Sequence, residues 1–268
     1  IMAKNAGPTP MRMVLDNIQA QGRYTFTGRD AAHAGPRSEA ALGAALRRLK
    51  RQGRIVSPRR GFYVLVPPEY RAAGSPPASW FIDDLMRFLR QPYYVGVLSA
   101  AAIHGAAHQQ PQVFQVITDR PSRPAHAGRV HIAFHVGRPI ERRHTELKQT
   151  DTGTMVVATP ETTAFDLVRY PAAAGHLNNV ATVLRELAER LDASSLVRLA
   201  DAYAISDVQR LGYLLEHGGR SDLTEPLAIW LASRRFRPVA ISPGEPRGEA
   251  RLNARWRVIL NETIEVDL

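Results

Sequence analysis

The chain has 268 residues, 44% hydrophobic and 22% charged, which is typical of a globular protein with one large or two ordinary domains. It contains no cysteine, which excludes disulfides, thiolate catalysis and cysteine-based metal sites. No run reaches the roughly 20 apolar residues of a membrane-spanning helix, and the N-terminus IMAKNAGPTPMRM lacks the apolar region of a secretory signal. We therefore expect a cytoplasmic protein without a membrane partner.

The net charge of +10 is concentrated near the N-terminus. Residues 1–71 contain thirteen lysine and arginine residues and four acidic ones, whereas residues 72–268 are almost neutral. The break coincides with VPPEYRAAGSPPAS, residues 66–79, a proline-rich stretch without periodicity that is typical of a linker. We therefore predict a first domain over 1–71, a linker over 72–79 and a larger domain over 80–268. The positive first domain indicates an anionic partner.

Ahead of the linker, the pattern predicts three helices and a β-hairpin. The first helix carries apolar residues on one face, namely Met11, Val14, Leu15 and Ile18. A short extended piece over 24–26 follows, and Thr27 with Asp30 forms a capping-box pattern at the second helix. The third helix begins near Pro36, a residue suited to a first helical position. Its buried stripe consists of Leu42, Ala45, Leu46 and Leu49.

Two extended runs, over 54–57 and 62–66, then flank the turn Pro58-Arg59-Arg60-Gly61. Two helices joined by a tight turn and followed by a β-hairpin predict a winged helix-turn-helix.

The face of the third helix opposite the leucine stripe combines small residues with cationic ones. A slim stripe allows close approach to a major groove, where guanidinium groups reach guanine edges or phosphates. The hairpin tip is expected to lie beside the neighbouring sugar–phosphate backbone. No exposed aromatic stripe backs the arginine face, so it is not typical of a membrane-binding helix. The predicted contacts to double-stranded DNA are Arg37, Ser38, Ala40, Ala44, Arg47, Arg48, Lys50, Arg51, Arg59 and Arg60.

The larger domain mixes helices and strands. Its predicted elements are a helix over 80–91, an extended start leading into a small-residue helix over 93–107, strands over 113–118, 129–136 and 154–158, and a helix that Thr159 caps and Pro160 begins. After residue 175 every pattern is helical. The predicted fold class is α+β: an N-terminal winged helix-turn-helix followed by a larger mixed α/β domain with a helical C-terminal half.

Several residues of the larger domain are of types found in catalytic and metal sites. His104 and His108 stand at i, i+4 without a third ligand, so we interpret them as helix-end or core histidines. Glu146-Leu147-Lys148 has the shape of a nuclease metal site, but its polar flanks favour a charged hairpin or loop. Ser99 is interpreted as a helix N-cap. Solvated or capping roles are assigned to Asp83, Asp84, Asp166 and Asp201. No catalytic residue, metal site or cofactor is predicted.

Four ordered blocks extend over nearly the whole chain: RRGFYVLVPPEY, YYVGVLSAAAIHGAAHQQPQVFQVIT, TPETTAFDLVRYPAAAGHLNNVATVLRELAERL, and QRLGYLLE together with LNARWRVILNE. In these blocks the sequence resembles the AbiEi family, antitoxins of the abortive-infection E type in type IV toxin–antitoxin systems.

The resemblance implies an N-terminal domain that represses its own operon at inverted repeats. It also implies a C-terminal domain that counters a nucleotidyltransferase-like toxin, generally without a stable complex. Two enzyme alternatives stay open. One is a kinase-like antitoxin, which some relatives suggest, and the other is a winged-helix–nuclease fusion.

Overall fold

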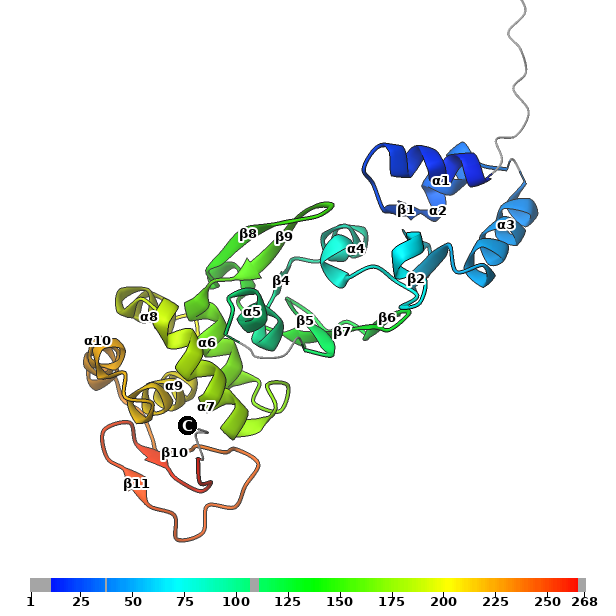
Figure 1. The fold of residues 1–268 in the computed structure, drawn as a ribbon. Helices are drawn as coiled ribbons and strands as arrows, with labels where there is room; N and C mark the ends of the chain where they lie inside the picture. The colour runs from blue at the N-terminus through cyan, green and yellow to red at the C-terminus, as the bar shows by residue number, and fades with distance from the viewer. Residues whose placement is uncertain (1–10, 37, 107–110, 265–268) are drawn as a thin grey trace, which may run out of the picture.

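The computed structural model describes residues 11–36, 38–106 and 111–264. Figure 1 shows the N-terminal helices at one end of the molecule, a mixed sheet in the middle and a group of helices at the other end. This arrangement confirms the predicted α+β fold class.

The N-terminal elements confirm the predicted winged helix-turn-helix. In chain order they are α1 (Met11–Ala20), β1 (Thr25–Thr27), α2 (Gly28–Ala34), α3 (Glu39–Arg51), β2 (Ile55–Arg59) and β3 (Phe62–Leu65). The three strands form an antiparallel sheet in the order β1-β3-β2. Thr27 and Asp30 form the predicted capping box at the start of α2.

Strand β3 is covered on both faces, because successive side chains of a strand point to opposite sides. Leu65 joins the small core of the N-terminal helices, and Tyr63 packs against the same core. Phe62 and Val64 belong instead to the main core of the larger domain. The wing, which is the hairpin of β2 and β3, therefore also packs against the larger domain.

The larger domain is built around a mixed sheet that the described residues form with six strands in the order β6-β7-β5-β4-β9-β8. The strands are β4 (Tyr93–Val95), β5 (Val113–Thr118), β6 (Ala125–Ala127), β7 (Val130–Val136), β8 (Thr145–Thr150) and β9 (Gly153–Ala158). Strands β5 and β7 run parallel, as do β4 and β9, and the other neighbours are antiparallel. Helices α4 (Ile82–Leu89), α5 (Val97–Ile103) and α6 (Pro160–Arg169) accompany the sheet, and Thr159 caps α6 as predicted.

The C-terminal half is helical, as predicted, up to residue 232. Its helices are α7 (His176–Leu187), α8 (Ala193–Ala200), α9 (Ile205–His217) and α10 (Ser221–Ala232). The expectation that all of the rest is helical is wrong, because β10 (Val239–Ala240), β11 (Leu252–Asn253) and β12 (Val258–Ile259) pair into a small sheet. Two-residue strands are too short for an alternation of apolar and polar residues to reveal them.

The segment predicted as a linker, residues 72–79, lies against the larger domain. Ser75, Pro76 and Ala78 are buried, and the carbonyl of Ala73 accepts a hydrogen bond of 2.8 Å from the amide of Arg129. Its prolines and glycine exclude a long helix or strand but not tertiary contact. The segment therefore packs as part of the larger domain.

Candidate nucleic-acid interface

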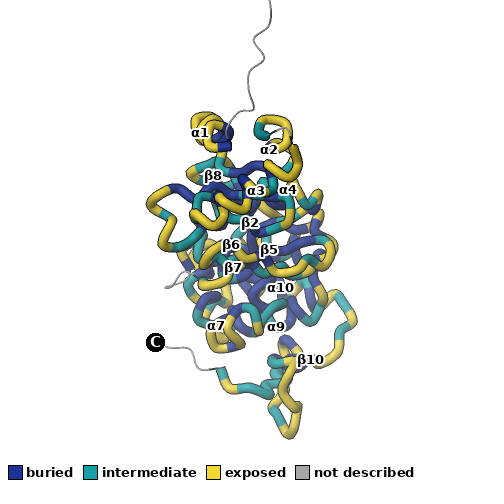
Figure 2. The backbone as a smooth tube through the Cα atoms, turned by 90° about the vertical axis from the view of Figure 1, so that its right-hand side faces the viewer, coloured by how far each residue is buried: buried dark blue, intermediate teal, exposed yellow. Residues whose placement is uncertain are grey.

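Helix α3 presents the predicted arginine face to solvent. Ser38 caps the helix by accepting a hydrogen bond of 3.2 Å from the amide of Ala41. The predicted apolar stripe of Leu42, Ala45, Leu46 and Leu49 is buried. The residues opposite this stripe are exposed, namely Ala40, Ala44, Arg47, Arg48, Lys50 and Arg51. Figure 2 shows α3 at the surface of the face turned toward the viewer. Arg37 lies outside the described residues.

Two contacts shape the edge of this face. The guanidinium of Arg47 lies 3.3 Å from the position that a Cβ atom on Gly43 would occupy, so the absence of a side chain at Gly43 leaves room for Arg47. The ammonium of Lys50 lies 5.3 Å from the ring centroid of Tyr63, an attractive cation–π contact. The pattern of apolar residues along α3 reveals neither contact.

The wing differs from its predicted form. Pro58 and Arg59 belong to β2, so the turn consists of Arg60 and Gly61, whose φ of +82° suits glycine. Arg60 is exposed at the tip. The guanidinium of Arg59 instead donates to the carbonyl of Arg123 and, at 3.0 Å, to that of Pro124. Of the two arginines predicted as phosphate contacts, Arg60 faces solvent and Arg59 joins the wing to the larger domain.

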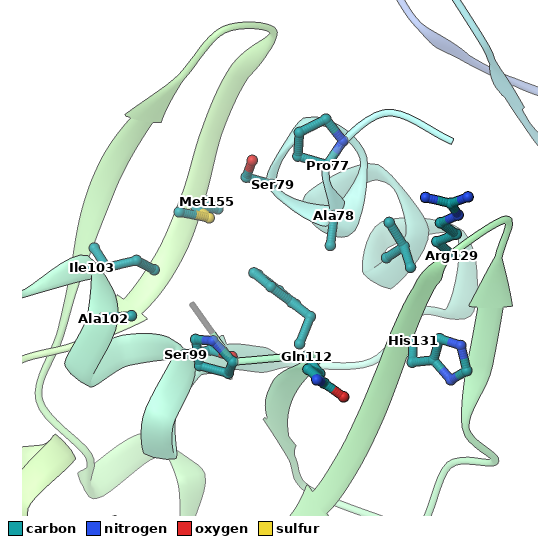
Figure 3. A pocket seen from close by; sticks show the side chains of 13 residues that line it. Pro77, Ala78, Ser79, Ser99, Ala102, Ile103, Gln112, Arg129, His131 and Met155 are labelled. Carbon is teal, nitrogen blue, oxygen red and sulfur yellow. The ribbon is translucent and has the colours of Figure 1, made fainter. Parts of the chain in front are cut away.

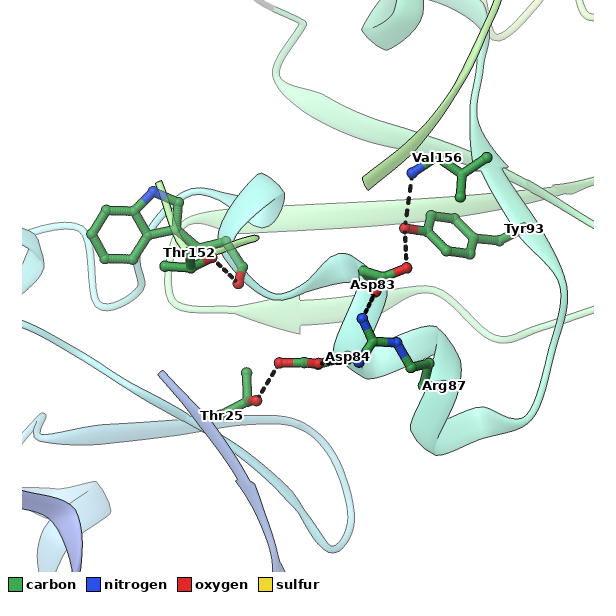
Figure 4. Close-up of polar contacts among 8 residues, drawn as sticks. Thr25, Asp83, Asp84, Arg87, Tyr93, Thr152 and Val156 are labelled. Atoms are coloured by element: carbon green, nitrogen blue, oxygen red, sulfur yellow. Dashed lines mark hydrogen bonds and ion pairs between the residues drawn. The ribbon is translucent and has the colours of Figure 1, made fainter. Parts of the chain in front are cut away.

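A polar contact between β1 and α4 reinforces the junction of the wing and the larger domain, and further contacts hold the carboxylates of α4 in place (Figure 4). The hydroxyl of Thr25 donates to Asp84 at 2.5 Å, and the hydroxyl of Tyr93 donates to Asp83 at 2.9 Å. Arg87 pairs with both carboxylates. The interpretation of Asp83 and Asp84 as solvated or capping residues is therefore wrong, since both take part in tertiary contacts.

Aromatic rings complete the junction. The indole of Trp80 meets the rings of Tyr24 and Tyr70 edge-on, at centroid distances of 4.8 and 5.2 Å. Phe62 of the wing lies 5.4 Å from Phe88 of α4. Such pairs add about 0.5–1.5 kcal/mol each beyond their buried area. These contacts fix the orientation of the wing relative to the central sheet.

The described residues of the enzyme-like motifs make contacts within the larger domain. His104 is buried, and its Nε2 lies 2.7 Å from the carbonyl of Ala158, while burial lowers the pKa of its imidazole. His108 lies outside the described residues. Glu146 and Lys148 form an ion pair of 2.8 Å on β8, an edge strand of the sheet. Within the described ranges no three His, Asp or Glu residues are grouped closely enough to hold a metal ion.

Two polar residues of the larger domain are placed differently from their prediction. Ser99 lies inside α5, whose N-cap is Gly96, and its hydroxyl accepts a hydrogen bond of 2.9 Å from the amide of Gln115. Asp166 is fully buried rather than solvated. Tyr203 and Tyr94 donate to its Oδ1 at 2.9 and 3.4 Å. The sequence around Asp166 does not reveal that this side of α6 is buried, because apolar residues flank it in the chain.

Burial raises the pKa of the Asp166 carboxyl to about 6, and the positive charge of Arg143 opposes this shift. The guanidinium of Arg143 is itself buried and lies 3.3 Å from the ring centroid of Tyr203. The carboxyl and the guanidinium therefore belong to one polar cluster inside the core. Sealed from solvent, this cluster offers no access to a substrate.

A pocket of about 550 Å³ lies between the predicted linker, residues 72–79, and strands β5 and β7 (Figure 3). Apolar side chains such as Ile103, Phe114 and Met155 line most of it. Arg129 and His131 stand along one wall, on the side of β7. Among the described residues that line it there is no carboxylate.

The fold is that of a winged helix-turn-helix attached to a larger α+β domain, and its exposed arginine face is typical of a DNA-binding regulator. Comparison with protein families identifies it further. A model described as "Transcriptional regulator, AbiEi antitoxin" matches residues 13–66, and one described as "AbiEi antitoxin C-terminal domain" matches residues 94–217. The chain belongs to the AbiEi antitoxin family, and it is an antitoxin and transcriptional regulator.

A solved structure supports the fold. The chain is similar to the crystal structure of the Rv2827c protein from Mycobacterium tuberculosis, with a TM-score of 0.66 and 19% identity over 95% of this chain and 93% of that one. No curated protein matches the chain. None of the helices that the structure describes has the length and apolar character needed to cross a bilayer.

Proposed function

We propose that the chain represses its own operon by inserting α3 into the major groove at inverted repeats. The exposed arginine face of α3, opposite its buried leucine stripe, carries this proposal. Arg47 and Arg51 stand one helical turn apart, so both can reach base edges from one side of the helix. Arg48, Lys50 and the wing residue Arg60 supply contacts to the phosphates. Arg37 and Ser38, at the start of α3, are proposed to lie close to the DNA as well.

The larger domain is proposed to counter a nucleotidyltransferase-like toxin as a functional rather than a stable physical partner. In this proposal it acts without catalytic turnover and requires no cofactor. The burial of Asp166 supports this view, because this carboxyl, whose pKa burial raises to about 6, lies inside the core without access to a substrate.

The two activities are expected to separate by mutation. In cells that carry a reporter under the promoter of its own operon, Arg47→Gln/Arg51→Gln should lose repression, because neutral amides replace the guanidinium groups that read bases. The same variant should still rescue growth when the neighbouring toxin gene is expressed, because the larger domain is unchanged.

Arg235→Gln/Arg237→Gln is a matched control, since both arginines are exposed between α10 and β10. It should retain repression and rescue. Full repression by Arg47→Gln/Arg51→Gln would contradict the role of α3. Loss of rescue in a folded variant would contradict the division of roles between the domains.

A further inference from the structure

A second concentration of positive charge lies in the larger domain, where the near-neutral total conceals it. Residues 120–140 contain four arginines and three histidines but no acidic residue. Their charge is balanced by carboxylates elsewhere in the sequence. What matters for an anionic partner is therefore where these side chains lie in the fold.

The structure places the first part of this segment directly beside the wing. Arg59 of β2 donates to the carbonyls of Arg123 and Pro124, and β2 lies in contact with β6. In Figure 1 β6 lies next to the wing hairpin. In Figure 2 α3, β2, β6 and β7 follow one another down one side of the molecule. Helix α3, whose arginines are exposed, and the segment 120–131 thus lie along one side of the protein.

The cationic side chains of this segment are available to a partner. Arg123 and Arg129, on either side of β6, are exposed, and no carboxylate of the described residues pairs with either. His126 and His131, directly opposite each other on β6 and β7, are also exposed and stack edge-to-face at 4.6 Å. Arg120 is more restrained, because it donates to the carbonyl of Arg90 at 2.9 Å.

The positive charge of Arg123 acts on Arg59 in the wing. Burial lowers the pKa of the Arg59 guanidinium, and the positive charge of Arg123 lowers it further. Like charges held this close cost free energy, which a polyanion spanning both domains recovers.

We propose that the β6–β7 hairpin is a second wing, which contacts the sugar–phosphate backbone beyond the first wing through Arg123 and Arg129. This inference rests on the proposed DNA binding by α3. A winged helix sets its recognition helix in the major groove and its wing over the adjacent backbone. An element fixed on the far side of the wing meets the flanking backbone. Such contacts strengthen binding without reading sequence.

The test uses the full chain and two duplexes, one spanning the promoter of its own operon and one shuffled. Binding is measured over a salt series for wild type, for Arg123→Gln/Arg129→Gln and for the control Arg235→Gln/Arg237→Gln. Both variants remove two exposed charges, but the control pair lies at the other end of the molecule. The carbonyl of Arg123 that holds Arg59 is unchanged, and thermal melting verifies folding.

We expect Arg123→Gln/Arg129→Gln to bind both duplexes about 10- to 30-fold more weakly at physiological salt, with a salt slope lower by roughly 1.8 for two lost phosphate contacts. Its preference for the promoter should stay the same. Shortening the DNA flanks should weaken wild type but not this variant.

Three results would overturn the inference. Affinities equal to those of the control would show that the hairpin does not touch DNA. Loss of promoter preference alone would show base reading rather than backbone contact. The third is a wild-type chain that binds neither duplex, which would refute the proposed function as well, whereas the first two leave it standing.

Discussion

At the residue scale, Asp166 shows how the core controls a charge. Its carboxyl lies on α6 among Tyr94, Tyr203 and Arg143, and burial raises its pKa to about 6. The tyrosine hydroxyls are kept protonated as donors, because burial and the nearby carboxyl raise the pKa of Tyr94 and Tyr203 well above the usual value. Within the described residues, Oδ2 of Asp166 has no hydrogen-bond partner. The folded state therefore favours the protonated carboxyl.

The free energy of unfolding of Asp166→Asn should increase relative to that of wild type as the pH rises. The pKa of Asp166 is higher in the folded than in the unfolded state, so its stabilising contribution is complete below about pH 4 and is lost as pH rises through about 6. The difference between the usual carboxyl pKa of 3.8 and about 6 corresponds to about 3 kcal/mol. Asparagine does not ionise, so the variant does not lose this stability as the pH rises. Its free energy of unfolding minus that of wild type should therefore rise by up to about 3 kcal/mol between pH 4 and pH 8.

Urea unfolding over this pH range measures the difference. Asp201→Asn is the control, since Asp201 is exposed at the end of α8 and pairs with Arg234. A difference in the free energy of unfolding between Asp166→Asn and wild type that stays constant with pH would contradict the raised pKa of Asp166.

At the element scale, the wing depends on the larger domain for its shape. Phe62 and Val64 bury one face of β3 in the main core, and Arg59 fastens β2 to the carbonyls of residues 123 and 124. A lysine carries the same charge but donates from a single nitrogen and lacks the planar fork of arginine. The charge and the geometry of Arg59 can therefore be tested separately.

Arg59→Lys should loosen the wing without changing the net charge. Loss of charge-assisted hydrogen bonds should lower the opening free energy of the hairpin by about 1–2 kcal/mol. Amide hydrogen exchange over 55–65 should become about 5- to 30-fold faster. Arg60→Lys, at the exposed tip, should exchange like wild type. Equal rates of amide exchange over 55–65 in Arg59→Lys and Arg60→Lys would show that Arg59 does not hold the wing.

The predictability of the elements follows from their length and burial. Helix α6 was predictable because apolar periodicity and its cap Thr159 coincide. Helices α1 and α3 were predictable from apolar periodicity, but the predicted start of α3 near Pro36 is wrong, because the helix begins at Glu39 after the N-cap Ser38. Strand β8 was harder, because exposed and half-buried positions alternate along TELKQT and Leu147 is 70% exposed. Such a strand carries no apolar face, so its polar sequence resembles that of a loop. Its pairing with β9 is a property of the fold.

At the scale of the whole molecule, the sequence indicated the arginine face of α3 but not what surrounds it. The face follows from helical periodicity, which is local. The role of Arg59 depends on carbonyls more than 60 positions away along the chain. The net charge of each domain likewise concealed the basic segment 120–131. Dividing the chain at the proposed linker, 72–79, would expose Phe62 and Val64, so DNA binding is best measured on the intact protein.

The most direct test compares promoter and shuffled duplexes for wild type and Arg47→Gln/Arg51→Gln. Wild type should prefer the promoter. The variant should lose about 1–3 kcal/mol of this preference for each base contact removed, while its affinity for the shuffled duplex falls much less. Equal losses on both duplexes, or a wild-type chain that binds them equally, would contradict the central claim that α3 reads the operator.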